Sequence, residues 1–340
     1  MIKINADRKV NLKELEKKHL DYMKAYHLPK LQSITGIKRI RNKGIYLYLL
    51  NHFDELVTGE PDVLRKIIID IQKMGVVFDS KSSKKTKLYK DLLEVFKYND
   101  FVTRYPNPAS ATPVWGAYTF VAELGVTVCP YCNRQYIFTL CDSHTGKTRG
   151  SIDHFYKKST YPYLALSFYN LIPSCKLCNS DLKGNKEFSL DTHVHPFLEE
   201  FGEAYTFSLK MRPGFTLFNR KGECQIDFLL GSGDEFDIEL KSNTPDNKFE
   251  DRLKNSADIF KLKELYNMHK DYVVELIKKS VMYPDSRIDE LLHQYQGKLF
   301  TSRVDVIQTL LSNYVQSAHL DKRILAKLSR DISRELGIVN

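Results

Sequence analysis

The chain has 340 residues, 42% hydrophobic and 12% aromatic, which is enough apolar material for two or three folded units. Charged residues make up 27%, an ordinary share that excludes a chain disordered throughout. No apolar run approaches the roughly 18 residues that cross a membrane. The first residues also lack the apolar stretch of a secretory signal, so we expect a cytoplasmic protein.

Positive charge is concentrated in the N-terminal third. The net charge is +9, and residues 1–104 hold 22 Lys and Arg against 13 Asp and Glu, which accounts for the whole excess. Clustered positive charge is typical of proteins that bind phosphate backbones. A solvated helical surface gives a similar count. The basic segments 38–44 and 81–87 therefore either contact phosphate or are solubilising loops.

Residues 1–104 are predicted to form a basic helical domain. Apolar residues recur at helical spacing from Leu12 onward, and the same pattern predicts helices over 45–57, 63–74 and 88–98. Pro61 suits the first turn of a helix, where its missing N–H is not needed. A proline-rich connector over 105–113 predicts the domain boundary.

Residues 113–200 are predicted to form a second domain that contains the functional residues. A short helix over 114–124 ends at Gly125. Residues 135–141 and 148–155 alternate in hydrophobicity and predict two strands. The second of two cysteine pairs should then open a helix, so the expected order is strand, strand, helix.

Residues 201–340 are predicted to form a small antiparallel sheet followed by helices. Four short strands are expected, over 205–209, 215–218, 225–230 and 236–240. Beyond Asp246 the apolar spacing is helical. The predicted fold class is therefore α+β, a mainly helical chain with a small central mixed unit.

Two Cys-x-x-Cys pairs flank the central unit. Cys129 and Cys132 are separated from Cys175 and Cys178 by forty-two residues. Cytosolic thiols are normally reduced, and four thiolates close a tetrahedral zinc site with no open position. We therefore predict a structural Zn²⁺ whose binding energy is part of the folding energy.

Asp153 and His154 stand together between the cysteine pairs. Consecutive side chains of a strand point to opposite faces, so one can hold a metal while the other faces an attacking water. A histidine near neutrality suits a general base. Asp153 and the amide of Asn179 are hard oxygen donors, which favour Mg²⁺ or Mn²⁺. Such a metal would neutralise charge on a scissile phosphate.

The span 129–184 resembles an HNH endonuclease of the ββα-metal type. It has Cys-x-x-Cys, Asp-His, Asn-Leu, Cys-x-x-Cys-Asn and then Lys-Gly. By position, the resemblance implies that His154 is the general base. It implies that Asp153 and Asn179 hold the catalytic metal.

The same resemblance implies two supporting residues. Asn170 would brace the loop that orients the base, and Lys183 would contact the scissile or adjacent phosphate. Here the spacing departs from the family pattern, because the segment from Asn179 to Lys183 is one residue longer than Asn-x-x-Lys.

A longer pattern is also similar to bacterial HNH proteins of anti-phage defence loci. It comprises Ile-Asp-His-Phe, Asn-Leu-Ile-Pro-Ser-Cys and a closing Leu-Ser-Arg-Asp-Ile-Ser. Septu-like, retron-associated and Zorya-like nuclease subunits are the relatives it resembles. This resemblance implies a protein partner, often an ATPase.

The leading hypothesis is a metal-dependent DNA endonuclease. Cleavage of RNA, for instance tRNA, is an alternative that the motif does not exclude. A non-catalytic zinc module that binds nucleic acid or a partner is a third, which predicts binding without metal-dependent cleavage.

Overall fold

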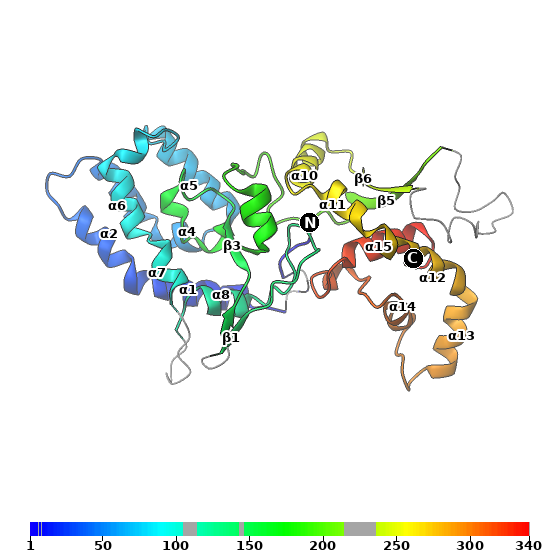
Figure 1. The fold of residues 1–340 in the computed structure, drawn as a ribbon. Helices are drawn as coiled ribbons and strands as arrows, with labels where there is room; N and C mark the ends of the chain where they lie inside the picture. The colour runs from blue at the N-terminus through cyan, green and yellow to red at the C-terminus, as the bar shows by residue number, and fades with distance from the viewer. Residues whose placement is uncertain (6, 8, 105–113, 143–145, 214–235, 340) are drawn as a thin grey trace. The chain divides into compact units, whose positions relative to one another are not determined.

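The computed structural model describes residues 1–5, 7, 9–104, 114–142, 146–213 and 236–339 (Figure 1). They form two compact units. Unit 1 comprises Met1–Asp7, Pro130–Tyr136 and Glu200–Asn340, and unit 2 comprises Arg8–Cys129 and Ile137–Glu199. The connector at 105–113 lies outside the described residues, and the domain bounds drawn from the sequence stay a prediction.

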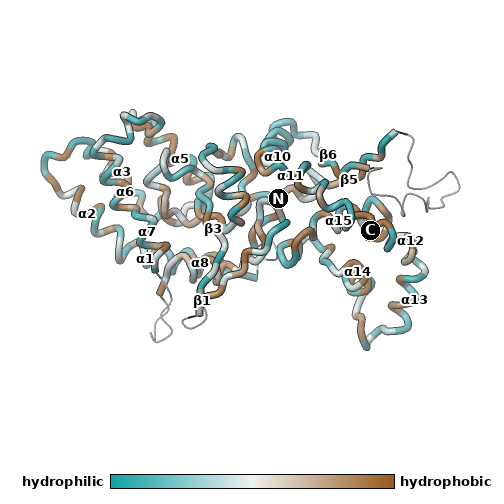
Figure 2. Tube along the Cα trace, in the orientation of Figure 1, coloured by the Kyte–Doolittle hydropathy of each residue, from teal (hydrophilic) through white to brown (hydrophobic). Residues whose placement is uncertain are grey.

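Unit 2 begins with amphipathic helices, and hydrophilic and hydrophobic residues alternate along them (Figure 2). Pro61 begins α5 at its first position, as predicted. Gly125 ends α8 with φ +68°, a left-handed conformation that glycine adopts without steric cost. The helix expected over 45–57 is two helices. The described helices are α1 (Leu12–Tyr26), α2 (Leu28–Thr35), α3 (Lys43–Asn51), α4 (Phe53–Thr58), α5 (Pro61–Lys73), α6 (Lys87–Val95), α7 (Tyr98–Val102) and α8 (Ala117–Leu124).

A buried histidine lies in the core of unit 2. His19 on α1 is fully buried and packs edge-on against Phe101 and Phe168. Its Nδ1 accepts a hydrogen bond from Trp115 Nε1 at 3.0 Å, and its Nε2 lies 2.7 Å from the carbonyl oxygen of Leu166. In the neutral imidazole, both ring nitrogens therefore form hydrogen bonds, one as acceptor and one as donor. Burial lowers the pKa of His19 to about 4.

Unit 2 should therefore lose stability on acidification. The unfolded chain protonates His19 near pH 6.5 and the folded chain only near 4. Between these two pH values, His19 lowers the free energy of unfolding by about 1.4 kcal/mol for each unit by which the pH falls. His19→Gln keeps one donor and one acceptor but does not titrate. Urea unfolding followed by fluorescence of Trp115, the single tryptophan, should show a shallower pH dependence for the variant.

His27 does not disturb this comparison. Burial also lowers its pKa, so it destabilises the fold in acid in the same direction, but it is present in both proteins. Equal pH slopes for the wild type and His19→Gln would show that His19 is not held neutral.

The strands of unit 2 pair differently from the sequence prediction. The segment expected as one strand over 148–155 is two, β2 (Gly146–Thr148) and β3 (Ser151–His154). β2 pairs with β1 (Leu140–Asp142), whereas β3 pairs antiparallel with β4 (Leu171–Ser174). Of the strand expected over 135–141, only the last two residues are in a strand, as part of β1. The order strand, strand, helix is formed by β3, β4 and the π-helix Leu177–Lys183.

Gly150 lies where the predicted strand divides. A Cβ atom there would lie 3.0 Å from Cβ of Ile137 and 3.3 Å from the carbonyl oxygen of Ser174. A side chain would therefore force apart the chain segments on either side. The glycine allows β3 to pair closely with β4 just before the Asp-His pair.

Unit 1 contains a two-stranded antiparallel sheet and the C-terminal helices. β5 (Tyr205–Met211) pairs with β6 (Phe236–Ser242), which confirms the first and last of the four predicted strands. The two expected over 215–218 and 225–230 lie outside the described residues. The helices, predicted from Asp246 onward, are α10 (Asn247–Ile259), α11 (Leu262–Tyr266), α12 (Lys270–Met282), α13 (Asp285–Tyr295), α14 (Arg303–Leu311) and α15 (Ala326–Glu335).

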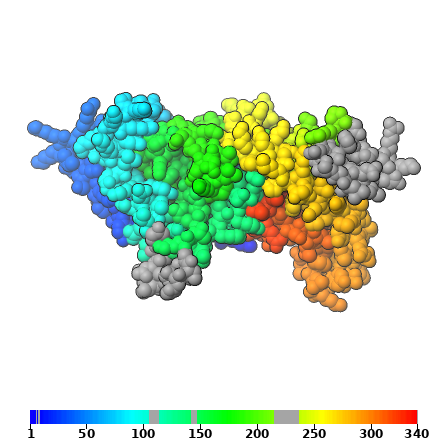
Figure 3. All heavy atoms as spheres, in the orientation of Figure 1, coloured from blue at the N-terminus to red at the C-terminus, as the bar shows by residue number. Residues whose placement is uncertain are grey.

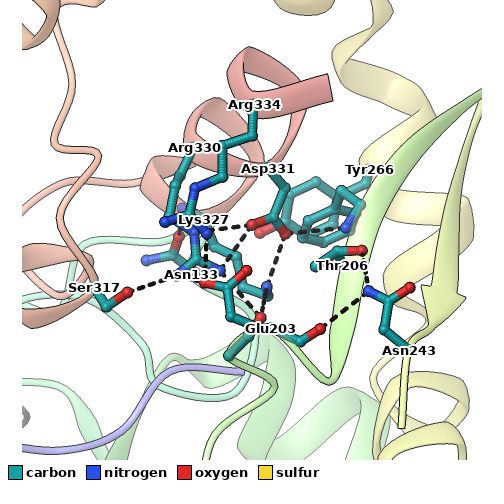
Figure 4. A network of polar contacts seen from close by, with 12 residues as sticks. Asn133, Glu203, Thr206, Asn243, Tyr266, Ser317, Lys327, Arg330, Asp331 and Arg334 are labelled. Atoms are coloured by element: carbon teal, nitrogen blue, oxygen red, sulfur yellow. Dashed lines mark hydrogen bonds and ion pairs between the residues drawn. The ribbon is translucent and has the colours of Figure 1, made fainter. Parts of the chain in front are cut away.

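Helix α15 has a buried charged face (Figure 4). Arg330 and Lys327 are 0% and 1% exposed, and both donate to the carboxylate of Asp331, at 2.8 and 2.7 Å. They also donate to the carbonyl oxygen of Gly202. Glu203 adds a second carboxylate, 3.2 Å from Arg330. The Leu-Ser-Arg-Asp-Ile-Ser motif therefore lies in the interior of unit 1, where it joins α15 to the start of β5.

Polar side chains also bond the outward-facing N–H groups of β5 and β6. Two acidic residues of α15 accept from β5, and an asparagine that follows α11 accepts from β6. The bonds run from Phe207 and Leu209 to Asp331 and Glu335, and from Ile238 to Asn267.

Within the described residues, no helix is both long and apolar enough to span a lipid bilayer. Helices predominate, with small antiparallel sheets. This confirms the mixed, mainly helical class expected from the sequence.

Candidate functional site

The two Cys-x-x-Cys pairs come together, as predicted. Cys129, Cys132, Cys175 and Cys178 are all buried, and their sulfur atoms lie within 4.8 Å of one another. Backbone N–H groups point at two of the sulfurs, from Arg134 to Cys132 and from Cys178 to Cys175, each at 3.4 Å. Such donors stabilise thiolates. The four cysteines can therefore hold a metal ion, and a four-sulfur set suits zinc.

The Asp-His pair ends strand β3. Asp153 lies opposite Ile172, and His154 lies opposite Leu171 on β4. Both side chains are largely buried, at 4% and 9% exposed. They line one cavity of about 390 Å³. The structure therefore brings both to the same hollow, whereas strand alternation alone predicts opposite faces.

His154 is held in a defined tautomer. Its Nε2 lies 2.9 Å from the carbonyl oxygen of Ala165, which only accepts, so Nε2 carries the proton and Nδ1 the lone pair. The ring of Tyr98 on α7 packs edge-on against it, with 4.6 Å between centroids. Burial lowers the pKa of His154 to about 4, and Lys158 acts in the same direction. The imidazole is therefore neutral at pH 7, the form that a base requires.

Asp153 is paired with Lys183. The lysine Nζ lies 2.8 and 2.7 Å from the two carboxylate oxygens, and it also donates to the carbonyl oxygen of His154. The Lys183 side chain is 2% exposed. Burial lowers the pKa of this amine, and the charge of Asp153 opposes the effect. Lys183 is therefore bonded to Asp153 in this structure, and its contact with a phosphate stays a prediction.

Asn170 bonds the chain that follows the Asp-His pair. Its Oδ1 accepts from the N–H of Tyr156 at 2.6 Å, and its Nδ2 donates to the carbonyl oxygens of Tyr156 and Leu164. The side chain is fully buried. Its three hydrogen bonds fix the segment between His154 and Ala165, whose carbonyl oxygen accepts the hydrogen bond of the His154 ring. This is the position that a bracing residue needs, although its role in a reaction stays a prediction.

The cavity also gathers Asn179 and several cations. Asn179 comes from the π-helix and is partly exposed. Asp181, two residues after Asn179, is exposed and does not line this cavity. Four further basic residues line the cavity. They are Arg149, Lys157, Lys158 and Lys186.

Among the lining residues that the sequence did not single out are Tyr98 and Arg149. Tyr98 comes from the N-terminal helices, more than fifty residues before His154, and nothing in its local pattern marks it. Arg149 precedes Gly150 and is half-buried. A basic residue four positions before Asp153 is the one signal that might have singled it out.

The comparisons with known proteins give one match. No protein-family model and no solved structure matches the chain. The chain is similar to a Septu protein PtuB of Bacillus thuringiensis, with 32% identity over 89 residues. The aligned residues are 25% of this chain and 32% of that protein. The chain therefore covers about a third of the length of this relative.

Proposed function

We propose that the chain is a metal-dependent DNA endonuclease of the HNH, ββα-metal type that acts in anti-phage defence. The observation that carries this proposal is the single cavity shared by Asp153, His154 and Asn179. One arginine and three lysines line the same cavity. A base and two oxygen donors in a cavity lined by cations suit a phosphodiester substrate.

His154 is the general base in this proposal. Its Nδ1 takes the proton from the attacking water, while the bond from Nε2 to Ala165 keeps the ring oriented. Asn170 holds the loop between these two residues. Tyr98 limits the rotation of the imidazole from the other side. These contacts hold the imidazole in position before the reaction, so that its ring does not have to reorient during catalysis.

Asp153 and Asn179 would hold the catalytic metal. One carboxylate and one amide oxygen are the donors that Mg²⁺ or Mn²⁺ prefers. Lys183 donates to both oxygens of the Asp153 carboxylate, each of which has two lone pairs. When bound, the metal would neutralise charge on the phosphate and on the departing oxygen. Lys183 positions Asp153 by holding both of its oxygens.

The defence role rests on the match to the Septu protein. The match supports membership of a defence system, and the motif resemblance adds a protein partner, often an ATPase. Co-purification of the chain with the products of neighbouring genes tests this part of the proposal.

Nuclease activity is tested with plasmid, single-stranded DNA and RNA, each incubated with Mg²⁺, Mn²⁺ or EDTA. We expect nicking or linearisation of the plasmid with metal and none with EDTA. Brief EDTA treatment followed by Mg²⁺ should restore cleavage, which separates the loosely held ion from structural zinc. Intact substrates under every condition would contradict the proposal, and cleavage of RNA alone would reassign the substrate.

A further inference from the structure

Two basic segments of unit 2 line a second cavity. Segment 38–44 lies between α2 and α3 and includes the first two residues of α3, and segment 79–87 leads into α6. Arg41 and Asn42 from the first, and Ser83, Thr86 and Lys87 from the second, line a hollow of about 350 Å³. None of its lining residues lines the cavity of Asp153. We call the basic side chains of both segments the two-loop cluster: Lys38, Arg39, Arg41, Lys43, Lys81, Lys84, Lys85 and Lys87.

The two-loop cluster holds most of the net charge of the chain. Its eight cations stand against one acidic residue, Asp79, which gives +7 of the chain's total of +9. All but Lys84 are exposed. Among the ion pairs of the described residues, Lys87 alone of these cations has a partner, Asp91. The positive charge is therefore not neutralised within the fold.

The helices that present the two segments are joined to each other. The hydroxyl of Tyr46 on α3 donates to Asp91 on α6 at 2.8 Å, and the same carboxylate pairs with Lys87. Phe78 packs on Tyr89 with 5.2 Å between ring centroids. These contacts hold the segments beside the same hollow. In Figure 1 the loop between α2 and α3 projects at the left edge, away from β3, and in Figure 3 the blue atoms of this part of the chain protrude at the left.

We propose that the two-loop cluster is a second nucleic-acid contact, which binds the phosphate backbone of duplex DNA away from the cleavage cavity. A single phosphate would neutralise only a small part of eight cations, whereas a duplex presents a charge about every 1.7 Å. Long exposed side chains adapt to any sequence, so this contact supplies affinity and not base recognition. The choice of DNA as ligand rests on the proposed nuclease function.

The test is salt-dependent binding of a fluorescein-labelled 30-base-pair duplex to the full chain. His154→Ala is used throughout to prevent cleavage. The first variant adds Lys38→Gln, Arg39→Gln, Arg41→Gln and Lys43→Gln, and the second adds Lys81→Gln, Lys84→Gln and Lys85→Gln. Each should weaken binding by about tenfold or more and lower the slope of log K against log [KCl] by about 0.9 per lost phosphate contact.

A control removes four charges from unit 1, as many as the first variant and one more than the second. It replaces four exposed lysines outside the ion pairs of the described residues: Lys248→Gln, Lys254→Gln, Lys263→Gln and Lys278→Gln. Its slope should stay close to that of the parent. If both cluster variants bind as the control does, the inference is overturned. A wild-type chain, with His154 intact, that binds DNA through the cluster but never cleaves it with Mg²⁺ or Mn²⁺ would overturn the nuclease proposal alone.

Discussion

Replacing His154 by alanine should lower the rate of DNA cleavage by at least about 100-fold. The imidazole is the group in the cavity that is neutral, oriented and able to take a proton. Its Nε2 donates its proton to the carbonyl oxygen of Ala165, so the basic lone pair of the ring is on Nδ1. Alanine has no such lone pair. Single-turnover cleavage with saturating Mg²⁺ measures the effect on the chemical step. Undiminished cleavage by this variant would exclude His154 as the base.

Two further variants separate chemistry from folding. His154→Gln retains an N–H donor for the Ala165 carbonyl oxygen but has no basic nitrogen, so it should fold normally and stay inactive. His293→Ala removes an exposed histidine of α13 and should cleave at the wild-type rate. An active His154→Gln protein would show that the residue only supports the loop.

We expect the four cysteines to hold a structural zinc, so that chelation of the metal, or Cys175→Ser, should unfold the part of the chain that carries Asp153 and His154. Apparent binding energies for structural zinc are about 10–16 kcal/mol, as large as the whole stability of a typical domain, about 5–15 kcal/mol. Loss of the metal also leaves four buried thiols close together. Far-ultraviolet circular dichroism and Trp115 fluorescence should both report the loss.

Cys141→Ser is the matched control for this prediction. Cys141 is a free, half-exposed cysteine outside the four-sulfur cluster, so its replacement should change neither zinc content nor thermal stability. Mass spectrometry of the native protein should find one zinc per chain. A Cys175→Ser protein that melts like the wild type would contradict a structural role for the metal.

The sequence predicted helices better than strand partners. Helices such as α5 follow from local apolar spacing and from Pro61, which act within one turn of chain. The pairing of β3 with β4 depends on residues far apart in sequence. Pro173 in β4 also weakens a strand signal, and it is tolerated because β4 has β3 as its sole partner within the described sheets.

The residues of the candidate site that belong to a sequence motif could be predicted from the sequence. The cysteines, Asp153 and Asn179 were all singled out, and the four sulfurs do meet. The Asp153–Lys183 pair was not foreseen, because it joins residues thirty positions apart that only tertiary packing brings together. Tyr98 could not be found, because tertiary packing alone brings α7 to His154.

The bonds along the outer sides of β5 and β6 have a consequence for association. An edge strand of a sheet exposes unpaired N–H and C=O groups, and these can pair with a strand of another chain and lead to aggregation. Here carboxylates and an amide already occupy the outward N–H groups of Phe207, Leu209 and Ile238. At these residues the sheet cannot act as a template for another chain. Helix α15, through its two acidic side chains, thus protects the protein from self-assembly at the edge of β5.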